Sequence, residues 1–171
     1  MRLAKYALAT LAVLLAVACA VVAIWPTAVP GRSGAEKADD RDVAVTAAAT
    51  NVTKAFLDVD YRDMDPRIAK VLSLSTGTFK NQYDTAKVDL KSQAQAAKAV
   101  ATGAVRSVGV GDIDSKHAVV YVAADTKVTN VSIEKDKAAG KTVQDKRYYR
   151  FQLSLTRVGD RWLLNDLEFI S

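Results

Sequence analysis

A run of apolar residues without a single charge extends from Tyr6 to Trp25, close behind the start of the chain. As a helix rising about 1.5 Å per residue, this run spans roughly 30 Å, the thickness of the hydrocarbon core of a bilayer. Aromatic residues are favoured at membrane interfaces, and the preceding Arg2 and Lys5 favour a cytoplasmic N-terminus. We therefore expect residues 1–25 to form a cytoplasmic start and a single-pass anchor in the cell membrane, with the rest of the chain extracytoplasmic.

Two other fates of this segment have some support. Ala18-Cys19-Ala20 has the small residues of a signal-peptide cleavage site, and the five residues ending at Cys19 loosely resemble a lipobox. A cleavable signal usually has an apolar stretch of about 7–15 residues, so the longer run here favours a retained anchor. Whether Cys19 is lipidated stays open. Because Cys19 is the single cysteine, no intramolecular disulfide can form.

Small residues recur along the predicted anchor at helical spacing. Such a ridge allows a second transmembrane helix to approach closely, although alanine is also simply frequent in this segment. Membrane lipids are the expected surroundings of the anchor. The residues singled out in it are Tyr6, Ala12, Ala16, Ala20 and Trp25.

After the anchor, residues 26–40 contain proline, glycine and mixed charges and are expected to form a tether. The pattern then takes the period of a helix. Apolar residues recur every three or four positions over residues 45–59, and again over residues 79–90. Between these segments, Asp65 and Pro66 predict the cap and the first residue of a short helix.

The second half of the chain changes to the period of two that is typical of strands. Gly159-Asp160 predicts a tight turn between the last two strands. Residues 129–146 are polar and are expected to form a long hairpin loop. The predicted strands are residues 105–110, 117–128, 149–156 and 161–170.

Helices first and strands last, without alternation, indicate an α+β domain, which we place at residues 41–171. We expect three helices packed on a four-stranded curved antiparallel sheet in meander order. The apolar helix faces would lie in the concave side of a half-open cone. A domain of about 130 residues can bury a core of this kind without metals or disulfides.

The charge balance does not indicate a nucleic-acid partner. The formal net charge is +5, and Arg2 and Lys5 supply two of these charges ahead of the anchor. The other basic residues are spread among 19 acidic ones rather than gathered in one stripe. We therefore expect no nucleic acid among the partners.

Several local signatures resemble the Mce-associated membrane proteins of mycobacteria and related actinobacteria. They are the segments 56–62 (FLDVDYR), 76–79 (TGTF) with Tyr83, 147–151 (RYYRF) and 159–163 (GDRWL). The resemblance implies one N-terminal anchor and a domain of the NTF2-like cone fold. Distantly, the layout also resembles inner-membrane assembly proteins of type IV secretion systems.

The same resemblance implies a function. Mce complexes import lipids or sterols through the mycobacterial envelope, and the family plays an accessory role beside them. We therefore expect an accessory or stabilising subunit that binds Mce-complex proteins through its extracytoplasmic domain. The alternative is a carrier that holds a lipid or sterol in the pocket of the cone. The family has no catalytic residues to carry over, and no cofactor is expected.

The residues themselves offer little for catalysis. An enzyme on a cone fold needs an acid–base pair that converges in the cavity. His117 is the only histidine, and its place at the start of a predicted strand predicts an exposed side chain. We therefore expect that the protein is not an enzyme.

One group of carboxylates, Asp58, Asp60, Asp63 and Asp65, resembles a metal site at first reading. A calcium loop needs ligands at alternate positions followed by a glycine, but Arg62 takes one of those positions and no glycine follows. We expect no metal here, and we expect Asp58 to pair with Arg62 four residues later on a helix.

The candidate partner interface consists of aromatic and basic residues, the kinds that concentrate in interface hot spots. Tyr61 falls in the first predicted helix, where it either closes the mouth of the cone or completes the core below that helix. The three others lie on one predicted strand, where an ordinary solvent-facing surface is the alternative. The four residues are Tyr61, Arg147, Tyr148 and Arg150.

Overall fold

The computed structural model describes residues 32–170, with side chains from residue 38 onward. The predicted anchor at residues 6–25 and Cys19 lie outside the described residues. No helix in the described part of the chain combines the length and apolarity needed to cross a bilayer. The chain divides into two units between Arg41 and Asp42, and the second unit carries the fold described below.

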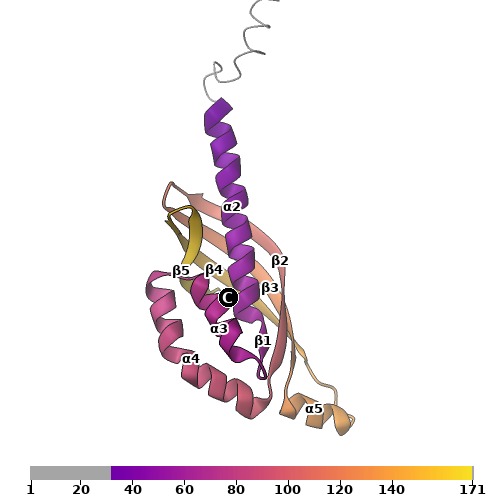
Figure 1. The fold of residues 1–171 in the computed structure, drawn as a ribbon. Helices are drawn as coiled ribbons and strands as arrows, with labels where there is room; N and C mark the ends of the chain where they lie inside the picture. The colour runs from indigo at the N-terminus through magenta and orange to yellow at the C-terminus, as the bar shows by residue number, and fades with distance from the viewer. Residues whose placement is uncertain (1–31, 171) are drawn as a thin grey trace, which may run out of the picture. The chain divides into compact units, whose positions relative to one another are not determined.

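The described chain runs through four helices and five strands (Figure 1). Helix α2 begins at Arg32, inside the predicted tether, and continues into the second unit. The helices are α2 (Arg32–Leu57), α3 (Met64–Ser73), α4 (Gly77–Ala97) and α5 (Val131–Ala138). The strands are β1 (Val59–Asp60), β2 (Val100–Ile113), β3 (His117–Thr129), β4 (Lys146–Val158) and β5 (Arg161–Phe169).

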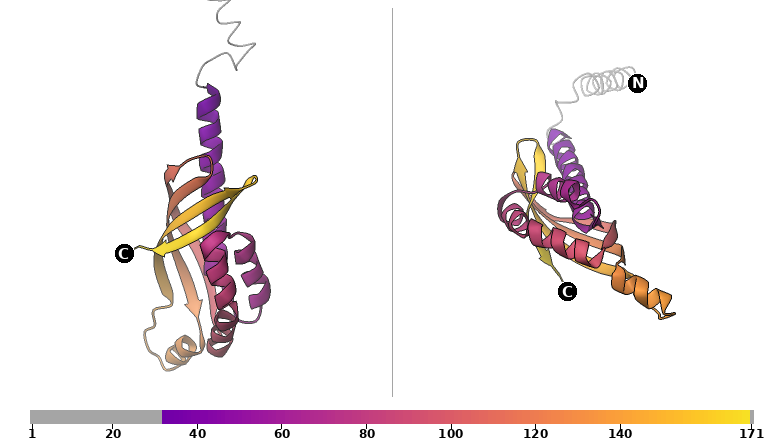
Figure 2. Two further views of the ribbon diagram at one scale, coloured as in Figure 1. Left: turned by 90° about the vertical axis from the view of Figure 1, so that its left-hand side faces the viewer. Right: turned by 60° about the horizontal axis from the view of Figure 1, so that its bottom comes forward.

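The strands form one antiparallel sheet in the order β1-β2-β3-β4-β5. The sheet curls strongly, so that β5 runs at a steep angle to β2 (Figure 2). The predicted α+β class, the curved antiparallel sheet and the meander order are confirmed. The predicted count of four strands is wrong, because β1 adds a fifth that pairs Val59 with Ala101 and Asp60 with Val100. Two residues are too few to show a period in the sequence.

The core lies between one face of the sheet and helices α2 and α4. On α2, Val45, Ala49 and Val52 share one face and are buried, as the helical period predicts. On β4, the alternate residues Phe151, Leu153 and Leu155 are buried against them. The ring of Phe151 meets Phe56 edge-on, with centroids 6.1 Å apart. We call this side of the sheet the inner face.

The link between α3 and α4 is held against the last strand. Leu164 donates its N–H to the carbonyl of Leu74 at 2.9 Å, and its own carbonyl accepts the N–H of Thr76 at 2.7 Å. The buried hydroxyl of Ser75 donates to the carbonyl of Val71 at 2.7 Å. These bonds tie the helical layer to β5, so the inner face is covered up to that edge.

Several element boundaries differ from the sequence expectation, and one helix was not expected. Helix α3 starts at Met64 with Asp63 as its N-cap, so Pro66 is the third residue of the helix and not the first. The first four N–H groups of a helix have no acceptor within it, so proline, which lacks an N–H, fits either position. Strand β2 begins at Val100 rather than residue 105. The expected loop at residues 129–146 contains α5, which buries no side chain and is capped by Asn130 accepting the N–H of Ile133 at 2.9 Å. A helix without an apolar face leaves no periodic signal.

Candidate partner-binding face

The sheet presents its second face away from the core, and we call it the outer face. On β3, Ala118, Val120, Val122 and Ala124 are buried on the inner face, so the residues between them point outward. Tyr121 is 45% exposed on this outer face. By the same alternation, β4 turns Tyr148 outward, and this ring is 77% exposed. Two large rings are therefore exposed on the same face of the sheet.

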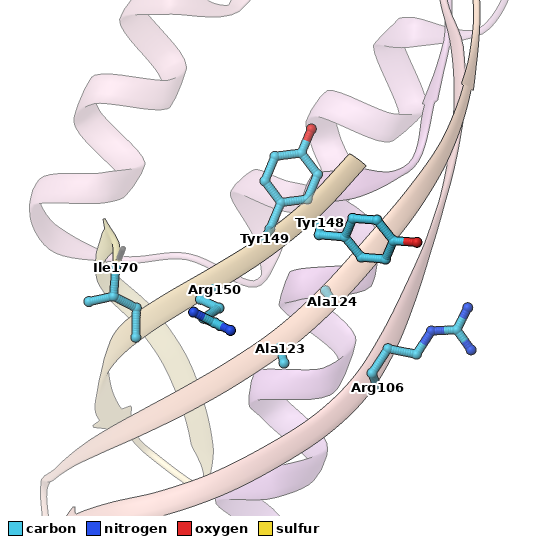
Figure 3. Close-up of a pocket in the computed structure, with 7 residues that line it drawn as sticks. All are labelled: Arg106, Ala123, Ala124, Tyr148, Tyr149, Arg150 and Ile170. Atoms are coloured by element: carbon cyan, nitrogen blue, oxygen red, sulfur yellow. The ribbon is translucent and has the colours of Figure 1, made fainter. Parts of the chain in front are cut away.

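A groove runs across three strands of the outer face (Figure 3). Arg106 rises from β2, Tyr148 and Arg150 rise from β4, and Ala123 of β3 lies between them. Ile170 closes one end, where its N–H donates to the carbonyl of Arg150 at 3.0 Å. This hollow has a volume of about 540 Å³.

A second hollow of about 360 Å³ continues the first along β2 and β3. The two share Ala123, Arg150 and Ile170, and the second adds Ser107 and Tyr121 to the lining. We call the combined feature the outer groove. Its floor is formed by the small side chain of Ala123, and its walls by larger aromatic, aliphatic and basic side chains.

Arg106 owes its place in the groove to an irregularity of β2. The register with β3 shifts between Val105 and Ser107, so Arg106 is the extra residue of a β-bulge. Its Nε and Nη2 donate to the two carboxylate oxygens of Asp125 at 2.8 and 3.0 Å. These side-chain hydrogen bonds hold the pKa of Asp125 below its ordinary value. The carboxylate is therefore ionised and paired at neutral pH, and it fixes the guanidinium on one wall.

Arg150 differs from Arg106 in having no ion pair or side-chain hydrogen bond with any residue in the described range 38–170. It lies in both hollows, near the middle of the outer groove. A guanidinium presents a planar fork of donors that matches a carboxylate. Arg150 is therefore available to a ligand at the centre of the groove.

The structure places the four predicted interface residues in three different settings. Tyr148 and Arg150 lie together in the outer groove. Arg147 is exposed on the same strand, but the alternation of β4 places it on the inner face, opposite Thr126 of β3. Tyr61 is half-buried against Met64, in a small cluster with α3 and α4, which agrees with the packing role considered for it. The predicted residues therefore do not form one patch.

The groove also contains residues that the sequence did not single out, namely Arg106, Tyr121 and Ile170. Arg106 and Asp125 are 19 positions apart and meet only through the register of β2 with β3. Arg106 lies three positions from Gly103 and from Gly109, and a single basic residue in such a strand carried no distinctive signal. Tyr121 could have been found, because it alternates with Val120 and Val122 in a predicted strand.

The carboxylates considered for metal binding have separate structural roles. The predicted pair of Asp58 with Arg62 is wrong, because α2 ends at Leu57 and the helical spacing does not reach Arg62. Asp58 instead accepts the N–H of Gly103 at 2.8 Å, and Arg62 donates two side-chain bonds to Asp60 at 2.8 and 2.7 Å. These side-chain bonds lower the pKa of Asp60 to about 2.

The remaining members of this group are equally dispersed. Both oxygens of Asp65 accept from Nζ of Lys91 at 2.7 Å, and Asp63 is the N-cap of α3. In the described part of the chain, no three histidine, cysteine, aspartate or glutamate side chains gather in a way that could hold a metal ion. His117 is 68% exposed at the first position of β3, as predicted, and its N–H donates to Asp114 at 2.7 Å.

Comparison with solved structures places the fold. The periplasmic domain of DotI aligns with a TM-score of 0.57 at 12% identity, over 75% of this chain and 94% of that one. An IcmL-like type IV secretion system protein from Legionella pneumophila aligns with a TM-score of 0.56 at 12% identity, over 74% and 91%. An NTF-2 like protein of unknown function from Shewanella oneidensis reaches 0.46 at 10% identity, over 75% and 98%. Only the first two bear on the fold, and at this identity they show the fold alone.

Comparison of sequences shows the family. A protein of Mycobacterium tuberculosis named "Uncharacterized protein Rv1363c" is 26% identical over 136 residues, which is 80% of this chain and 49% of that protein. This chain thus spans about half the length of the relative it matches. A family model matches residues 6–171, nearly the whole chain including the predicted anchor. The protein belongs to the family described as uncharacterized protein Rv1363c/MT1408-like.

Proposed function

We propose that this protein is a membrane-anchored accessory or stabilising subunit of an Mce-type lipid or sterol import complex. The anchor is residues 6–25, the N-terminus is cytoplasmic, and the extracytoplasmic domain binds a protein of the complex through the outer groove. The resemblance of the segments at residues 56–62 and 147–151 to Mce-associated proteins supports the choice of complex. The mycobacterial relative is compatible with this choice.

The observation that carries the proposal is the outer groove itself. The inner face of the sheet is covered by α2 and α4, whereas the outer face exposes Tyr148 and Arg150 beside a concave floor. Tyr and Arg supply much of the binding free energy of protein interfaces when they are buried near the centre. An anchor adds to this, because it raises the effective concentration of the domain near any membrane-bound partner.

The inner face offers less support for a lipid carrier. The space that a cone ligand would occupy is filled by Val45 and Val52 of α2, Phe79 of α4 and Phe151 of β4, all of them buried in one cluster. The ring of Phe56 contacts both Phe79 and Phe151, at centroid distances of 6.0 and 6.1 Å. A sterol on this face would have to displace packed aromatic rings.

We infer in addition that the role is not catalytic. His117 is exposed at the start of β3, beside the turn at residues 114–116, and its Nδ1 is 3.6 Å from Asp114, a carboxylate that is itself largely exposed. Asp114 accepts the N–H groups of Lys116 and His117 at 2.6 and 2.7 Å, so it stabilises the turn. Acid–base catalysis gains from a site that excludes water, which this turn does not provide.

Co-purification tests the proposal. Tagged full-length protein is expressed in an actinobacterial host that contains Mce genes, and its membranes are solubilised in mild detergent. We expect Mce subunits to co-purify with the wild type, and Arg150→Glu to reduce their yield by about tenfold, because a like charge at an interface costs over 1 kcal/mol. Arg147→Glu is the matched control, on the same strand but the opposite face. Absence of every Mce component from the wild-type preparation would refute the proposal.

A further inference from the structure

The outer groove has a charge of one sign. The side chains that line its two hollows include Arg106 and Arg150 but no aspartate or glutamate. The nearest carboxylate with a defined role, Asp125, already accepts both of its hydrogen bonds from Arg106. The groove therefore carries an uncompensated positive charge at Arg150, and the complementary ligand is an anion.

The walls of the groove set a second requirement. Tyr148, Tyr121 and Ile170 are all more than a third exposed, and Ala123 between them leaves space for an incoming side chain. Burial of this apolar surface on binding is favourable roughly in proportion to the area removed from water. A bare inorganic anion would leave the walls exposed, so the ligand carries an apolar group beside its negative charge.

We propose that the outer groove binds an extended segment of a partner protein in which a carboxylate and an apolar side chain stand two residues apart and therefore share one face. The carboxylate receives the fork of donors from Arg150, and the apolar side chain packs over Ala123 between Tyr148 and Ile170. This inference rests on the proposed function, because it names the chemistry of the partner segment at the same surface. Arg106 remains paired with Asp125 and supports the wall rather than the ligand.

The shape of the groove favours a peptide over a lipid surface. A membrane surface is contacted by side chains that protrude together, whereas the hollow here crosses three neighbouring strands and is lined at its base by Ala123. A single extended chain can place alternate side chains into such a hollow. A carboxylate also matches the planar guanidinium with two parallel hydrogen bonds.

Binding of a defined peptide tests this inference directly. Full-length protein in detergent is titrated against a fluorescein-labelled hexapeptide in which glutamate and leucine stand two positions apart with serine between them, so that both side chains share one face of the extended chain, with anisotropy as the readout. The matched probe replaces each glutamate by lysine. We expect saturable binding of the Glu/Leu peptide only, weakened about tenfold or more by Arg150→Glu and less by Arg150→Lys, which keeps the charge but loses the fork. Arg147→Glu is expected to leave the affinity unchanged.

Several results would contradict the inference. Binding of the Lys/Leu peptide with equal affinity, loss of binding in Arg147→Glu as much as in Arg150→Glu, or no binding to the wild type would each overturn the inference. So would stronger competition by mixed micelles of the same detergent with an anionic phospholipid than by the unlabelled Glu/Leu peptide, since that result indicates a lipid surface. If the peptide binds but no Mce subunit co-purifies, the proposed function fails and this inference stands. If Mce subunits co-purify equally with Arg150→Glu, this inference and the assignment of the binding surface to the outer groove both fail, and only the accessory role beside the complex stands.

Discussion

Gly103 allows the end of α2 to lie against β2, and adding one methyl group there tests this packing. A Cβ on Gly103 would lie 2.5 Å from Cβ of Leu57 and 3.4 Å from its Cδ1. Carbon atoms in ordinary contact are about 3.5–4.0 Å apart, so one of the two elements must move by about 1 Å. Rotation of the Leu57 side chain cannot relieve the overlap, because its Cβ is fixed to the backbone of α2.

The magnitude follows from three contributions. Overpacking of this kind costs about 1–3 kcal/mol. Retreat of α2 would also lengthen the 2.8 Å bond from the N–H of Gly103 to Asp58, at a cost of about 1 kcal/mol. Replacing a strand glycine by alanine offsets this by about 0.5–1 kcal/mol through the unfolded state. We therefore expect Gly103→Ala to lower the free energy of unfolding by about 2 kcal/mol, and Tm by about 5–10 °C.

The assay is thermal unfolding of the full-length protein in one detergent, followed by far-UV circular dichroism. Gly109→Ala is the matched control on the same strand, because a Cβ at Gly109 would meet no atom within 4 Å. The control is expected to keep or slightly raise Tm. If Gly103→Ala behaves like Gly109→Ala, the close contact between Leu57 and β2 is refuted.

Three further outcomes follow from the described contacts. Arg62 lowers the pKa of Asp60 to about 2, so the pair stabilises the fold above the pKa of an unfolded aspartate. This stabilisation is lost as pH falls toward 2. The Tm difference between wild type and Asp60→Asn should therefore shrink between pH 5 and pH 2. Phe151→Ala should lower the free energy of unfolding by about 3–5 kcal/mol in urea titrations, since the ring is fully buried among aromatic neighbours. Gly77→Ala should lower the free energy of unfolding by about 1–2 kcal/mol, because Gly77 has φ of 53° and an added Cβ would overlap the side chain of Asn165. An unchanged urea midpoint in Phe151→Ala or in Gly77→Ala would count against the packing described.

The parts of the fold that the sequence predicted are those with a long periodic signal. The buried stripe of α2 and the alternation of β4 are visible because a repeated burial pattern imposes a repeated composition. The turn at Gly159 and Asp160 was equally predictable, and Gly159 has φ of 61°, which favours glycine. Strand β1 and helix α5 lacked such signals, since one has two residues and the other has no buried face.

The candidate site was predicted only in part, for a reason of geometry. Tyr148 and Arg150 are two positions apart on a strand and share a face, whereas Arg147 is displaced by one position and takes the other face. The sequence showed the three as one basic and aromatic segment. Arg106 joins the groove through a bulge and a cross-strand register, which depend on the paired strands together and not on either one alone.

In the proposed function, the outer face of the sheet contacts a protein of an Mce-type complex in the membrane. Photocrosslinking in intact cells tests this contact, with a photoreactive phenylalanine analogue in place of Tyr148 or, as the control, in place of the similarly exposed Val88 on α4. We expect a crosslink to an Mce subunit from position 148 and none from position 88. Equal crosslinking from both positions, or crosslinks from position 148 to lipid or to a second copy of this chain alone, would contradict the account.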